Sequence, residues 1–274
     1  MIVGFDPDFD DATWTLDWLD WPIVQVPVGE LAGGYRVEQE HVTRIEVFGR
    51  LYEMDPPLDV RGLYDPNGVL WMSDTPQERM MMYNNARQSH GHVLVGGAGL
   101  GLYPQYVTDA QSFTIVERSP VVMRLVGPLI QQVMAKRGVP VRFVLGDIEA
   151  YLRRDDPDSF DTIFIDTWER LDATMLPKIN QLRDLAARHL APGGHILLWG
   201  YRWMVRMFEE ACATVLMMPP EERDAWLAAQ EETNPRAVAM LSQIMAEFRG
   251  QTILRWELDS AVARCREWII TRTV

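Results

Sequence analysis

The sequence contains little that would indicate a metal protein, a disulfide-bonded protein or a membrane-spanning protein. It has only two cysteines among 274 residues, Cys212 and Cys265. Their spacing fits neither a zinc site nor a disulfide framework, so we expect two buried free thiols. No apolar run is long enough to span a bilayer. Met1–Asp20 is acidic where a signal peptide would be basic, so we expect no signal peptide and a cytoplasmic protein.

Positive charge is also scarce. The 26 Lys and Arg residues face 39 Asp and Glu residues, which gives a net charge of −13 at pH 7. A protein of this charge repels phosphate backbones and anionic membranes. We therefore expect neither a nucleic-acid partner nor a membrane partner. The length and the 47% hydrophobic content suffice for one large α/β domain, or for a domain with a small accessory one.

Residues 1–72 are predicted to form a small β-rich domain. Ile23–Val28, Tyr35–Gln39 and His41–Phe48 have the β-branched and aromatic composition of short strands. The turn sequence Asp65-Pro66-Asn67-Gly68 predicts a hairpin between its apolar flanks. The aspartates that precede Trp21 alternate with tryptophans, and we interpret this stretch as a solvated acidic arm that docks through its tryptophans.

Residues 73–274 are predicted to form a Rossmann-like domain, that is, an α/β fold with a doubly wound, mostly parallel sheet. Thr75 and Glu78 are placed to form a capping box at the start of its first helix. Apolar strands and helices then alternate as far as Trp199, which is typical of such a sheet.

After Trp199 the pattern contains more helix than a minimal sheet needs. We interpret the helices near 218–250 as an insertion. Two last strands are predicted at Thr252–Leu258 and Trp268–Val274.

The stretch HVLVGGAGLGLY, residues 92–103, is the centre of the predicted domain. Its apolar start is typical of a buried parallel strand. Gly97, Gly99 and Gly101 follow, and glycines let the backbone turn sharply and approach a ligand closely. A strand, a glycine loop and a helix together favour a nucleotide-type cofactor. A tight turn in an ordinary α/β domain is the alternative.

Acidic residues follow three of the later predicted strands, where an open parallel sheet binds its ligands. Glu117 stands where an acid accepts hydrogen bonds from ribose hydroxyls, or it is a charge flanking a helix. Asp147 suits an adenine amino group, or it caps the following helix, and the two roles can coexist. Asp166 is placed to position an acceptor or take a proton, or it is a structural cap.

With these motifs, residues 67–201 resemble the class I S-adenosylmethionine-dependent methyltransferases, and within them the spermidine synthase-like branch. VLVGGAGLG is similar to the glycine loop of that branch, TIVERSP to its ribose-binding segment and FDTIFIDTW to its fourth strand. VLGDIEAYL is similar to the adenine-side segment, which places Ile148 beside Asp147 in the cofactor site. The resemblance implies S-adenosylmethionine, or its decarboxylated form, as cofactor, and a homodimer.

The chain departs from the aminopropyltransferases of that branch at two positions. Leu100 stands where they have an acid in the glycine loop that holds the amino group of the decarboxylated donor, and leucine cannot do this. Gln77 is out of register with a glutamine of theirs. Asp166 matches the first of their two fourth-strand acids, and Glu169 falls where the second would be, so we assign both as candidate catalytic residues. Asp166 is also assigned to the cofactor site, because it is a strand-end acid that faces the cofactor.

Three functions follow as hypotheses. The first is a methyltransferase that uses S-adenosylmethionine on a small-molecule acceptor, with Trp168, Trp199 and Trp203 as pocket walls or core residues. The second is a polyamine aminopropyltransferase that uses decarboxylated S-adenosylmethionine. The third is a non-catalytic cofactor-binding or assembly protein that has kept the fold.

Overall fold

A computed structural model describes residues 3–47, 49–155 and 158–273. They form two compact units, each described by itself below. The first consists of Met1–Asp6, Asp10–Glu169 and Leu185–Trp199. The second consists of Pro7–Phe9, Arg170–Asp184 and Gly200–Val274. The first unit contains both sheets, and the second is helical.

A four-stranded antiparallel sheet forms the amino-terminal part of the first unit, where the sequence predicts a β-rich region. Its order is β1-β2-β3-β4. The Asp65 carboxylate fixes the turn between the last two strands by accepting hydrogen bonds from Asn67 N at 2.9 Å and Val69 N at 2.8 Å. The predicted hairpin is therefore confirmed. The strands are β1 (Gly29–Glu30), β2 (Arg36–Val47), β3 (Arg50–Tyr64) and β4 (Leu70–Ser73).

Two details of this sheet differ from the prediction. Ile23–Val28 forms no strand, because its backbone hydrogen bonds go to side chains: Val24 N donates to the Gln105 side chain, and the Val26 carbonyl accepts from Arg61. The two short strands predicted at Tyr35–Gln39 and His41–Phe48 are one strand, β2. Phe48 itself lies outside the described residues.

The second sheet of this unit has five strands, all parallel, in the order β7-β6-β5-β8-β9. Strands are added first on one side of β5 and then on the other, which is the doubly wound arrangement predicted from the alternation of strands and helices. Its central strands are almost fully buried, as their continuous apolar runs require. The strands are β5 (His90–Gly96), β6 (Asp109–Glu117), β7 (Val141–Leu145), β8 (Phe160–Ile165) and β9 (Leu190–Leu198).

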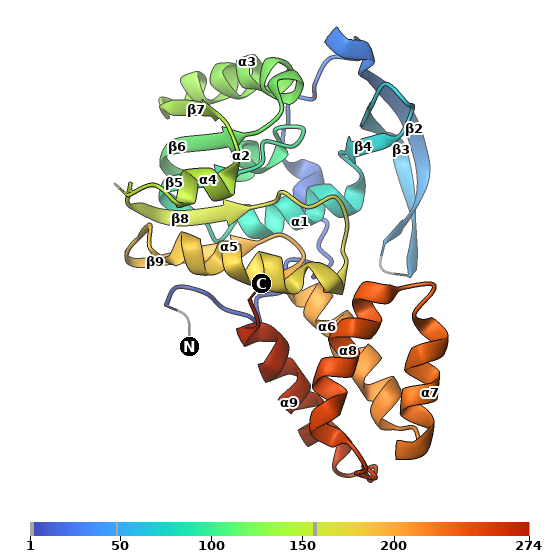
Figure 1. Cartoon of the computed structure of the whole chain (residues 1–274). Coiled ribbons are helices and arrows are strands. Elements are labelled where there is room, and N and C mark those ends of the chain that lie inside the picture. Colours follow the sequence, from blue (N-terminus) through green and yellow to red (C-terminus); the bar gives the residue numbers. More distant parts are fainter. Residues whose placement is uncertain (1–2, 48, 156–157, 274) are drawn as a thin grey trace. The chain divides into compact units, whose positions relative to one another are not determined.

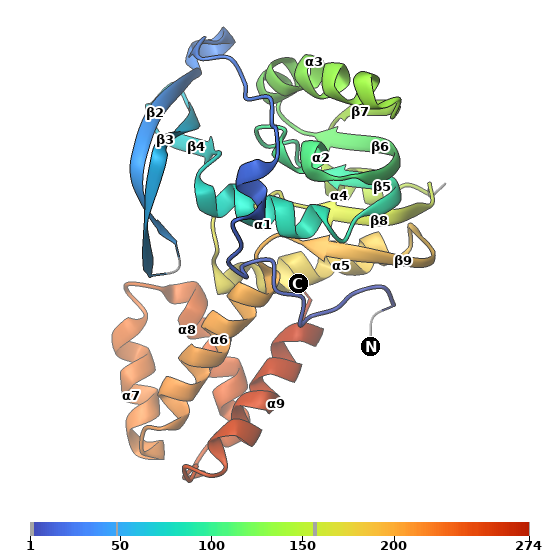
Figure 2. The same ribbon diagram turned by 180° about the vertical axis from the view of Figure 1, so that it is seen from behind.

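Helices lie on both faces of the parallel sheet. α4 covers the face seen in Figure 1, and α1 and α2 cover the opposite face seen in Figure 2. The Ser119 hydroxyl caps α3 by accepting from Val122 N, and Gly138 ends α3 at a φ of +71°. The helices are α1 (Pro76–Ala86), α2 (Leu102–Tyr106), α3 (Pro120–Arg137), α4 (Ile148–Leu152) and α5 (Leu176–Ala187), of which α5 begins in the second unit.

The capping box predicted for α1 is wrong. Thr75 stands at the N-cap but makes no side-chain cap hydrogen bond. Glu78 does not reach back to the start of α1, since it interacts with Asp11, Asp166 and Trp199 instead. This difference moves Glu78 from a local structural role into the candidate site described below.

The second unit contains α6 (Tyr201–Leu216), α7 (Pro220–Gln230), α8 (Pro235–Met245) and α9 (Leu258–Thr271). The two last strands predicted in this region are wrong: 252–257 forms no strand, and 268–271 is the end of α9. Val274, the last residue of the second predicted strand, lies outside the described residues. Cys212 and Cys265 are buried free thiols where α6 packs on α9, as predicted. No described helix is both long and apolar enough to cross a membrane.

Candidate functional site

The carboxyl ends of the parallel strands meet at one edge of the sheet. Gly96 pairs in register with Val116 of β6 and with Ile165 of β8, and Ile165 pairs with Leu198 of β9. The next residue of each strand still bonds to its neighbour: Gly97 N donates to the Val116 carbonyl at 2.9 Å, Asp166 N to the Gly96 carbonyl at 2.8 Å, and Trp199 N to the Ile165 carbonyl at 3.1 Å. The strands therefore end side by side, and the residues that follow them lie next to one another: the glycine loop, Glu117, Asp166 and Trp199.

The backbone of the glycine loop has a conformation that residues with a side chain would adopt only with strain. Gly97, Gly99 and Gly101 have φ values of +93°, +52° and +78°. A Cβ on Gly97 would lie 2.0 Å from the Asp166 carbonyl oxygen, so this position admits only glycine. A Cβ on Gly99 would meet nothing within 4 Å. The middle of the loop is thus open to a ligand, and its start touches the end of β8.

Glu117 holds this loop through its carboxylate. The residue is only 7% exposed. Its Oε2 accepts a hydrogen bond from Ala98 N at 2.9 Å, and its Oε1 accepts one from Ser119 N at 2.7 Å. A carboxylate has about four acceptor positions, so each oxygen can accept a further hydrogen bond. The geometry suits a pair of hydroxyl groups bound in front of the loop.

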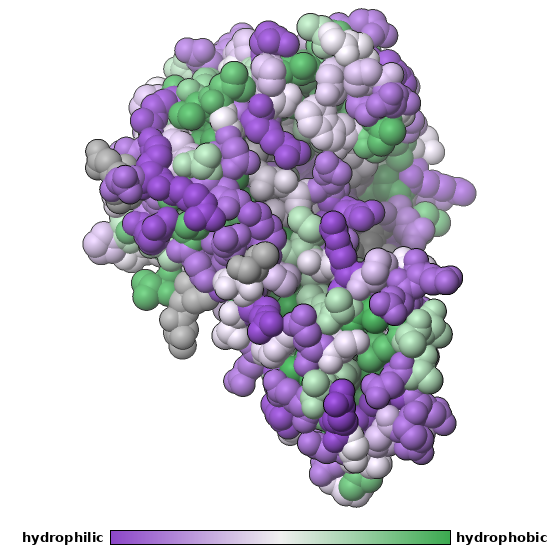
Figure 3. All heavy atoms as spheres, viewed as in Figure 1, coloured by the Kyte–Doolittle hydropathy of each residue, from purple (hydrophilic) through white to green (hydrophobic). Residues whose placement is uncertain are grey.

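Asp147 and Ile148 lie at the end of the neighbouring strand. Asp147 is exposed and caps α4, because its carboxylate accepts from Ala150 N at 3.0 Å. Ile148 is buried, and a Cβ on Gly96 would lie 2.7 Å from its Cγ1. Ile148 therefore packs directly against the strand that leads into the glycine loop, with Asp147 beside it. Around α4 the surface is strongly hydrophilic (Figure 3). Arg142 and Arg154 both pair with Asp158.

Asp166 lies in a strongly negative environment. Burial raises the pKa of its carboxyl well above the usual range of aspartate, and the charge of Glu78 raises this pKa further. Asp11 and Glu117 act in the same direction. A carboxyl group so placed holds a proton more tightly than usual and is able to exchange it with a bound ligand.

Glu78 of α1 is the second member of this group of acids. Burial raises its pKa to about 7, and the charge of Asp11 contributes to the rise. The indole N–H of Trp199 lowers the pKa of Glu78, though it makes no hydrogen bond of normal length. Asp11 itself is only 1% exposed, and its carboxylate accepts from Asn85 Nδ2 of α1 at 2.9 Å.

Several buried polar atoms around these acids have no hydrogen-bond partner among the described residues: Nε1 of Trp168, Nε1 of Trp199 and Oδ1 of Asn85. The rings of Trp168 and Trp199 lie 6.5 Å apart. A buried donor or acceptor without a partner costs about 1–3 kcal/mol, and these three atoms are free to hydrogen-bond a bound molecule.

Sequence reasoning missed Asp11 and Glu78 as members of the site. Asp11 was interpreted as part of a solvated arm, and Glu78 as half of a capping box. One feature of the sequence could have indicated Glu78: it lies on the predicted helix that precedes the strand leading into the glycine loop. Glu169, assigned beside Asp166, has an exposed side chain and is not among the charges that act on Asp166. Leu100 is buried in the loop at 5% exposure, and Trp203 belongs to the second unit.

Removing the carboxyl group of Glu78 is expected to change how stability depends on pH. Its raised pKa means that the folded state binds more protons than the unfolded state between about pH 4.5 and 7, so its contribution to stability falls as the pH rises through that window. We compare the free energy of unfolding of Glu78→Gln with that of the unaltered protein at each pH. The difference, variant minus unaltered protein, should therefore increase by about 1–3 kcal/mol from pH 5 to pH 8. Urea unfolding at both pH values measures this. Glu46→Gln, at an exposed position of β2, is the control, and equal gains for both variants would contradict the expectation.

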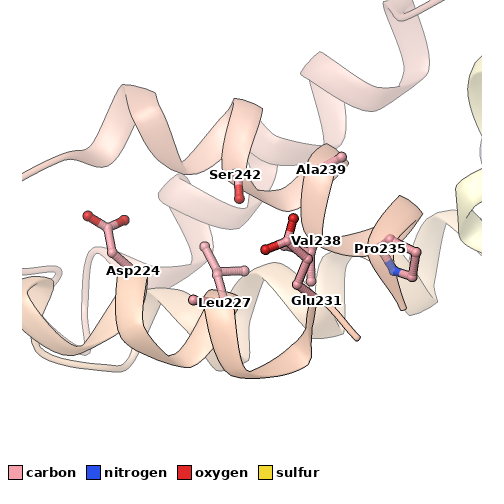
Figure 4. A pocket seen from close by; sticks show the side chains of 8 residues that line it. Asp224, Leu227, Glu231, Pro235, Val238, Ala239 and Ser242 are labelled. Atoms are coloured by element: carbon pink, nitrogen blue, oxygen red, sulfur yellow. The ribbon is translucent and has the colours of Figure 1, made fainter. Parts of the chain in front are cut away.

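The described residues contain no group of three or more His, Cys, Asp and Glu side chains arranged for a metal ion. A separate hollow lies in the second unit between α7 and α8, with Leu227 and Val238 in its wall and Asp224 and Glu231 on its rim. The Glu231 carboxylate is directed toward α8 (Figure 4). This hollow has no glycine loop and no strand ends in its wall, so we place the candidate site at the edge of the parallel sheet instead.

Neither a protein-family model nor a curated protein matches the sequence. Among solved structures, the chain is similar to a precorrin-6y C5,15-methyltransferase from Geobacter metallireducens, at 19% identity over 49% of this chain and 69% of that one, with a TM-score of 0.34. A spermidine synthase from Thermotoga maritima is 14% identical over 67% of this chain and 62% of that one, with a TM-score of 0.39. An amino pentose methyltransferase from Micromonospora echinaspora, solved with bound S-adenosylmethionine, is 23% identical over 42% and 45%, with a TM-score of 0.28.

The chain thus spans less than two thirds of the length of the second and third of these proteins. Two of the three are described as methyltransferases and one as a spermidine synthase. The fold of this chain is established by its own strand order and strand directions: a Rossmann-like, doubly wound parallel sheet with a separate antiparallel sheet at the amino terminus.

Proposed function

We propose that the protein is a transferase that binds S-adenosylmethionine at the glycine loop and moves its methyl group to a small-molecule acceptor. The observation that carries this proposal is the buried Glu117 carboxylate, held by Ala98 N and Ser119 N with acceptor positions to spare. In the proposal, Glu117 accepts hydrogen bonds from both ribose hydroxyls. The open backbone at Gly99 leaves room for the rest of the cofactor.

The other site residues take the following roles in this proposal. Asp147 accepts a hydrogen bond from the adenine amino group while it caps α4. Ile148 forms an apolar wall against the adenine ring. S-adenosylmethionine, when bound, supplies an electrophilic methyl group on a positively charged sulfur. Asp166 orients the acceptor and takes the proton that the acceptor loses. The exposed Glu169 does not act on Asp166, so in this proposal it only helps to orient a positively charged acceptor from the solvent side.

Aminopropyl transfer is the second candidate, and one observation favours it. Aminopropyl transfer requires an amine acceptor. The acids around Asp166 suit such an acceptor, because they can bind its ammonium form and take the proton that frees the attacking nitrogen. The buried Leu100 argues against it, because leucine offers no group for the free amino end of a decarboxylated donor. The acids around Asp166 thus favour an amine as acceptor, whereas Leu100 disfavours the decarboxylated compound as donor.

Calorimetric titration with S-adenosylmethionine, S-adenosylhomocysteine and decarboxylated S-adenosylmethionine separates these candidates. We expect the two ligands that carry a carboxylate to bind more tightly than the decarboxylated one. A preference for the decarboxylated donor would replace methyl transfer by aminopropyl transfer. If none of the three binds, the protein is not a transferase of this kind, and a non-catalytic assembly function takes its place.

Substitutions of Asp147 test its two roles separately. Asp147→Ser keeps a side-chain cap for α4, so its stability should change by less than about 0.5 kcal/mol, whereas Asp147→Ala should lose about 1 kcal/mol. Both variants should bind S-adenosylmethionine about tenfold more weakly, because both lose one hydrogen bond to adenine. Thermal unfolding and titration measure the two effects. Unchanged affinity in Asp147→Ser would leave this residue with the capping role alone.

A further inference from the structure

The side-chain amide of Gln105 connects two parts of the first unit that are far apart in the sequence. Gln105 belongs to α2, which follows the glycine loop, and it is fully buried. Its Nε2 donates to the Gly101 carbonyl at 2.9 Å and to the Val24 carbonyl at 3.0 Å. Its Oε1 accepts from Val24 N at 2.7 Å. One amide therefore binds both the last residue of the glycine loop and the amino-terminal segment.

The two hydrogen bonds to Val24 have the pattern that joins residues of neighbouring antiparallel strands. There, one residue donates its N–H to a partner and accepts at its carbonyl from the same partner, and the Gln105 amide offers both groups to Val24. Trp21 adds a third bond from the same segment, since its Nε1 donates to the Gln105 carbonyl at 3.0 Å. The amino-terminal segment, blue in Figure 2, is thus attached to α2 through Gln105.

The glycine loop is held at both of its ends. At the start, Ala98 N donates to the Glu117 carboxylate at 2.9 Å. At the end, Gly101 N donates to the Ala98 carbonyl at 2.9 Å, and the Gly101 carbonyl accepts from Gln105. Gly99, where the backbone is open to a ligand, lies between these two supports. A shift of Gly101 would therefore change the part of the loop that is placed to meet a ligand.

We infer that Gln105 is a positioning residue, through which the segment Trp21–Val24 holds the glycine loop in its binding conformation. If the segment moved away, the buried amide would lose its two bonds to Val24, and unpaired polar groups are costly away from water. A loop that is already ordered loses less freedom when a ligand binds. Because coupling between two sites is reciprocal, a ligand at the loop must also stabilise the segment. The identity of that ligand rests on the proposed function, whereas the coupling does not.

The first test compares two variants that each remove hydrogen bonds from α2. Gln105→Met keeps the length of the side chain and loses the amide, so it should bind S-adenosylhomocysteine about five- to tenfold more weakly than the unaltered protein. Arg137→Met is the matched control. Arg137 donates to the Gln105 carbonyl at 2.9 Å and to the Val107 carbonyl at 3.2 Å, but to neither Gly101 nor Val24. Its affinity should stay within about twofold, and equal losses in both variants would overturn the inference.

The second test has a readout that a merely structural role would not move. Hydrogen exchange is measured by mass spectrometry on the full chain with and without S-adenosylhomocysteine. In the unaltered protein, the ligand should slow exchange in the peptide that spans residues 21–28 by about fivefold. In Gln105→Met this slowing should disappear, while the glycine-loop peptide is still protected by the ligand. Slowing at 21–28 that persists in Gln105→Met would overturn the inference.

A third comparison uses the ligand-free protein and separates the inference from the proposed function. Exchange in the peptide that spans residues 97–103 should be about fivefold faster in Gln105→Met than in the unaltered protein, and unchanged in Arg137→Met. If S-adenosylhomocysteine does not bind the unaltered protein, the proposed function fails, and this comparison still decides the coupling. Loop exchange that is equal in Gln105→Met and in the unaltered protein overturns it.

A second variant keeps the test decisive if Gln105→Met does not fold. Trp21→Phe keeps an aromatic ring and loses only the indole N–H that donates to the Gln105 carbonyl. This loosens the segment without touching the glycine loop, so exchange in the peptide that spans residues 97–103 should rise by about twofold to threefold. Faster exchange at 21–28 alone, with the loop unchanged, would show that the segment does not hold the loop.

Discussion

Glu117→Gln is expected to bind S-adenosylmethionine about 100-fold more weakly than the unaltered protein, because hydrogen bonds to a charged group contribute about 1.5–3 kcal/mol each. The substitution keeps the shape of the side chain but removes its charge. It also replaces one of the two oxygens that accept from Ala98 N and Ser119 N by an NH2 group, which cannot accept. The loop therefore loses one of its two supports at the same time. Calorimetric titration measures the affinity.

Two controls separate the loss of binding from a loss of folding. Glu46→Gln removes an exposed carboxylate of β2 and should leave the affinity within about twofold. Titration of Glu117→Gln at a temperature well below its own unfolding midpoint keeps the variant folded. An affinity within about threefold of the unaltered protein would remove Glu117 from the cofactor site.

Arg79→Met is expected to lower the free energy of unfolding by about 3–5 kcal/mol, because it leaves a buried charge without its partner. The Arg79 and Asp74 side chains are 7% and 2% exposed. Arg79 Nη2 donates to Asp74 Oδ2 at 2.9 Å and to the Asp59 carbonyl at 2.6 Å, and its Nε donates to the Asp74 carbonyl at 2.8 Å. These bonds tie α1 to the antiparallel sheet. Urea unfolding measures the loss.

Arg87→Met on the same chain segment is the matched control. The Arg87 side chain is 57% exposed and lies 3.7 Å from the Asp17 carboxylate, so its loss should cost less than about 1 kcal/mol. The double variant Asp74→Asn, Arg79→Met should recover part of the stability lost in Arg79→Met, since it removes the stranded charge. Similar losses for Arg79→Met and Arg87→Met would show that the buried pair contributes no more than a surface pair.

The parts of the fold that were predictable depend on local sequence. The run from His92 to Gly101 predicted a strand followed by a loop because apolar residues and glycines stand next to one another in the chain. The turn at Asp65 is fixed by hydrogen bonds within four residues. In the same way, Asp147 was predicted to cap the helix that it does cap.

The acid group escaped prediction because its contacts are long-range. Asp11 and Asn85 are 74 residues apart and meet only in the folded chain. The sequence pattern of this stretch is that of a solvated acidic arm, and nothing in the pattern distinguishes the buried Asp11 from the other aspartates. Glu78 had a plausible local explanation as a capping residue, and the tertiary environment of Asp166 and Trp199 prevailed over it.

The carboxyl-terminal end shows the same effect in secondary structure. Trp268-Ile269-Ile270-Thr271 is rich in residues that favour strands, yet it forms the last turn of α9. Asn180 Nδ2 donates to the Ile269 carbonyl at 2.8 Å, and Arg183 Nη1 donates to the Ile270 carbonyl at 2.9 Å. Side chains from a distant part of the chain thus satisfy the carbonyls at this helix end.

A crystal structure of the protein with S-adenosylhomocysteine tests the central claim most directly. The account predicts that both ribose hydroxyls lie within hydrogen-bond distance of the Glu117 carboxylate, with the adenine beside Ile148 and the sulfur facing Asp166. A ligand bound elsewhere, or a Glu117 carboxylate that keeps only its contacts to Ala98 N and Ser119 N, would contradict it.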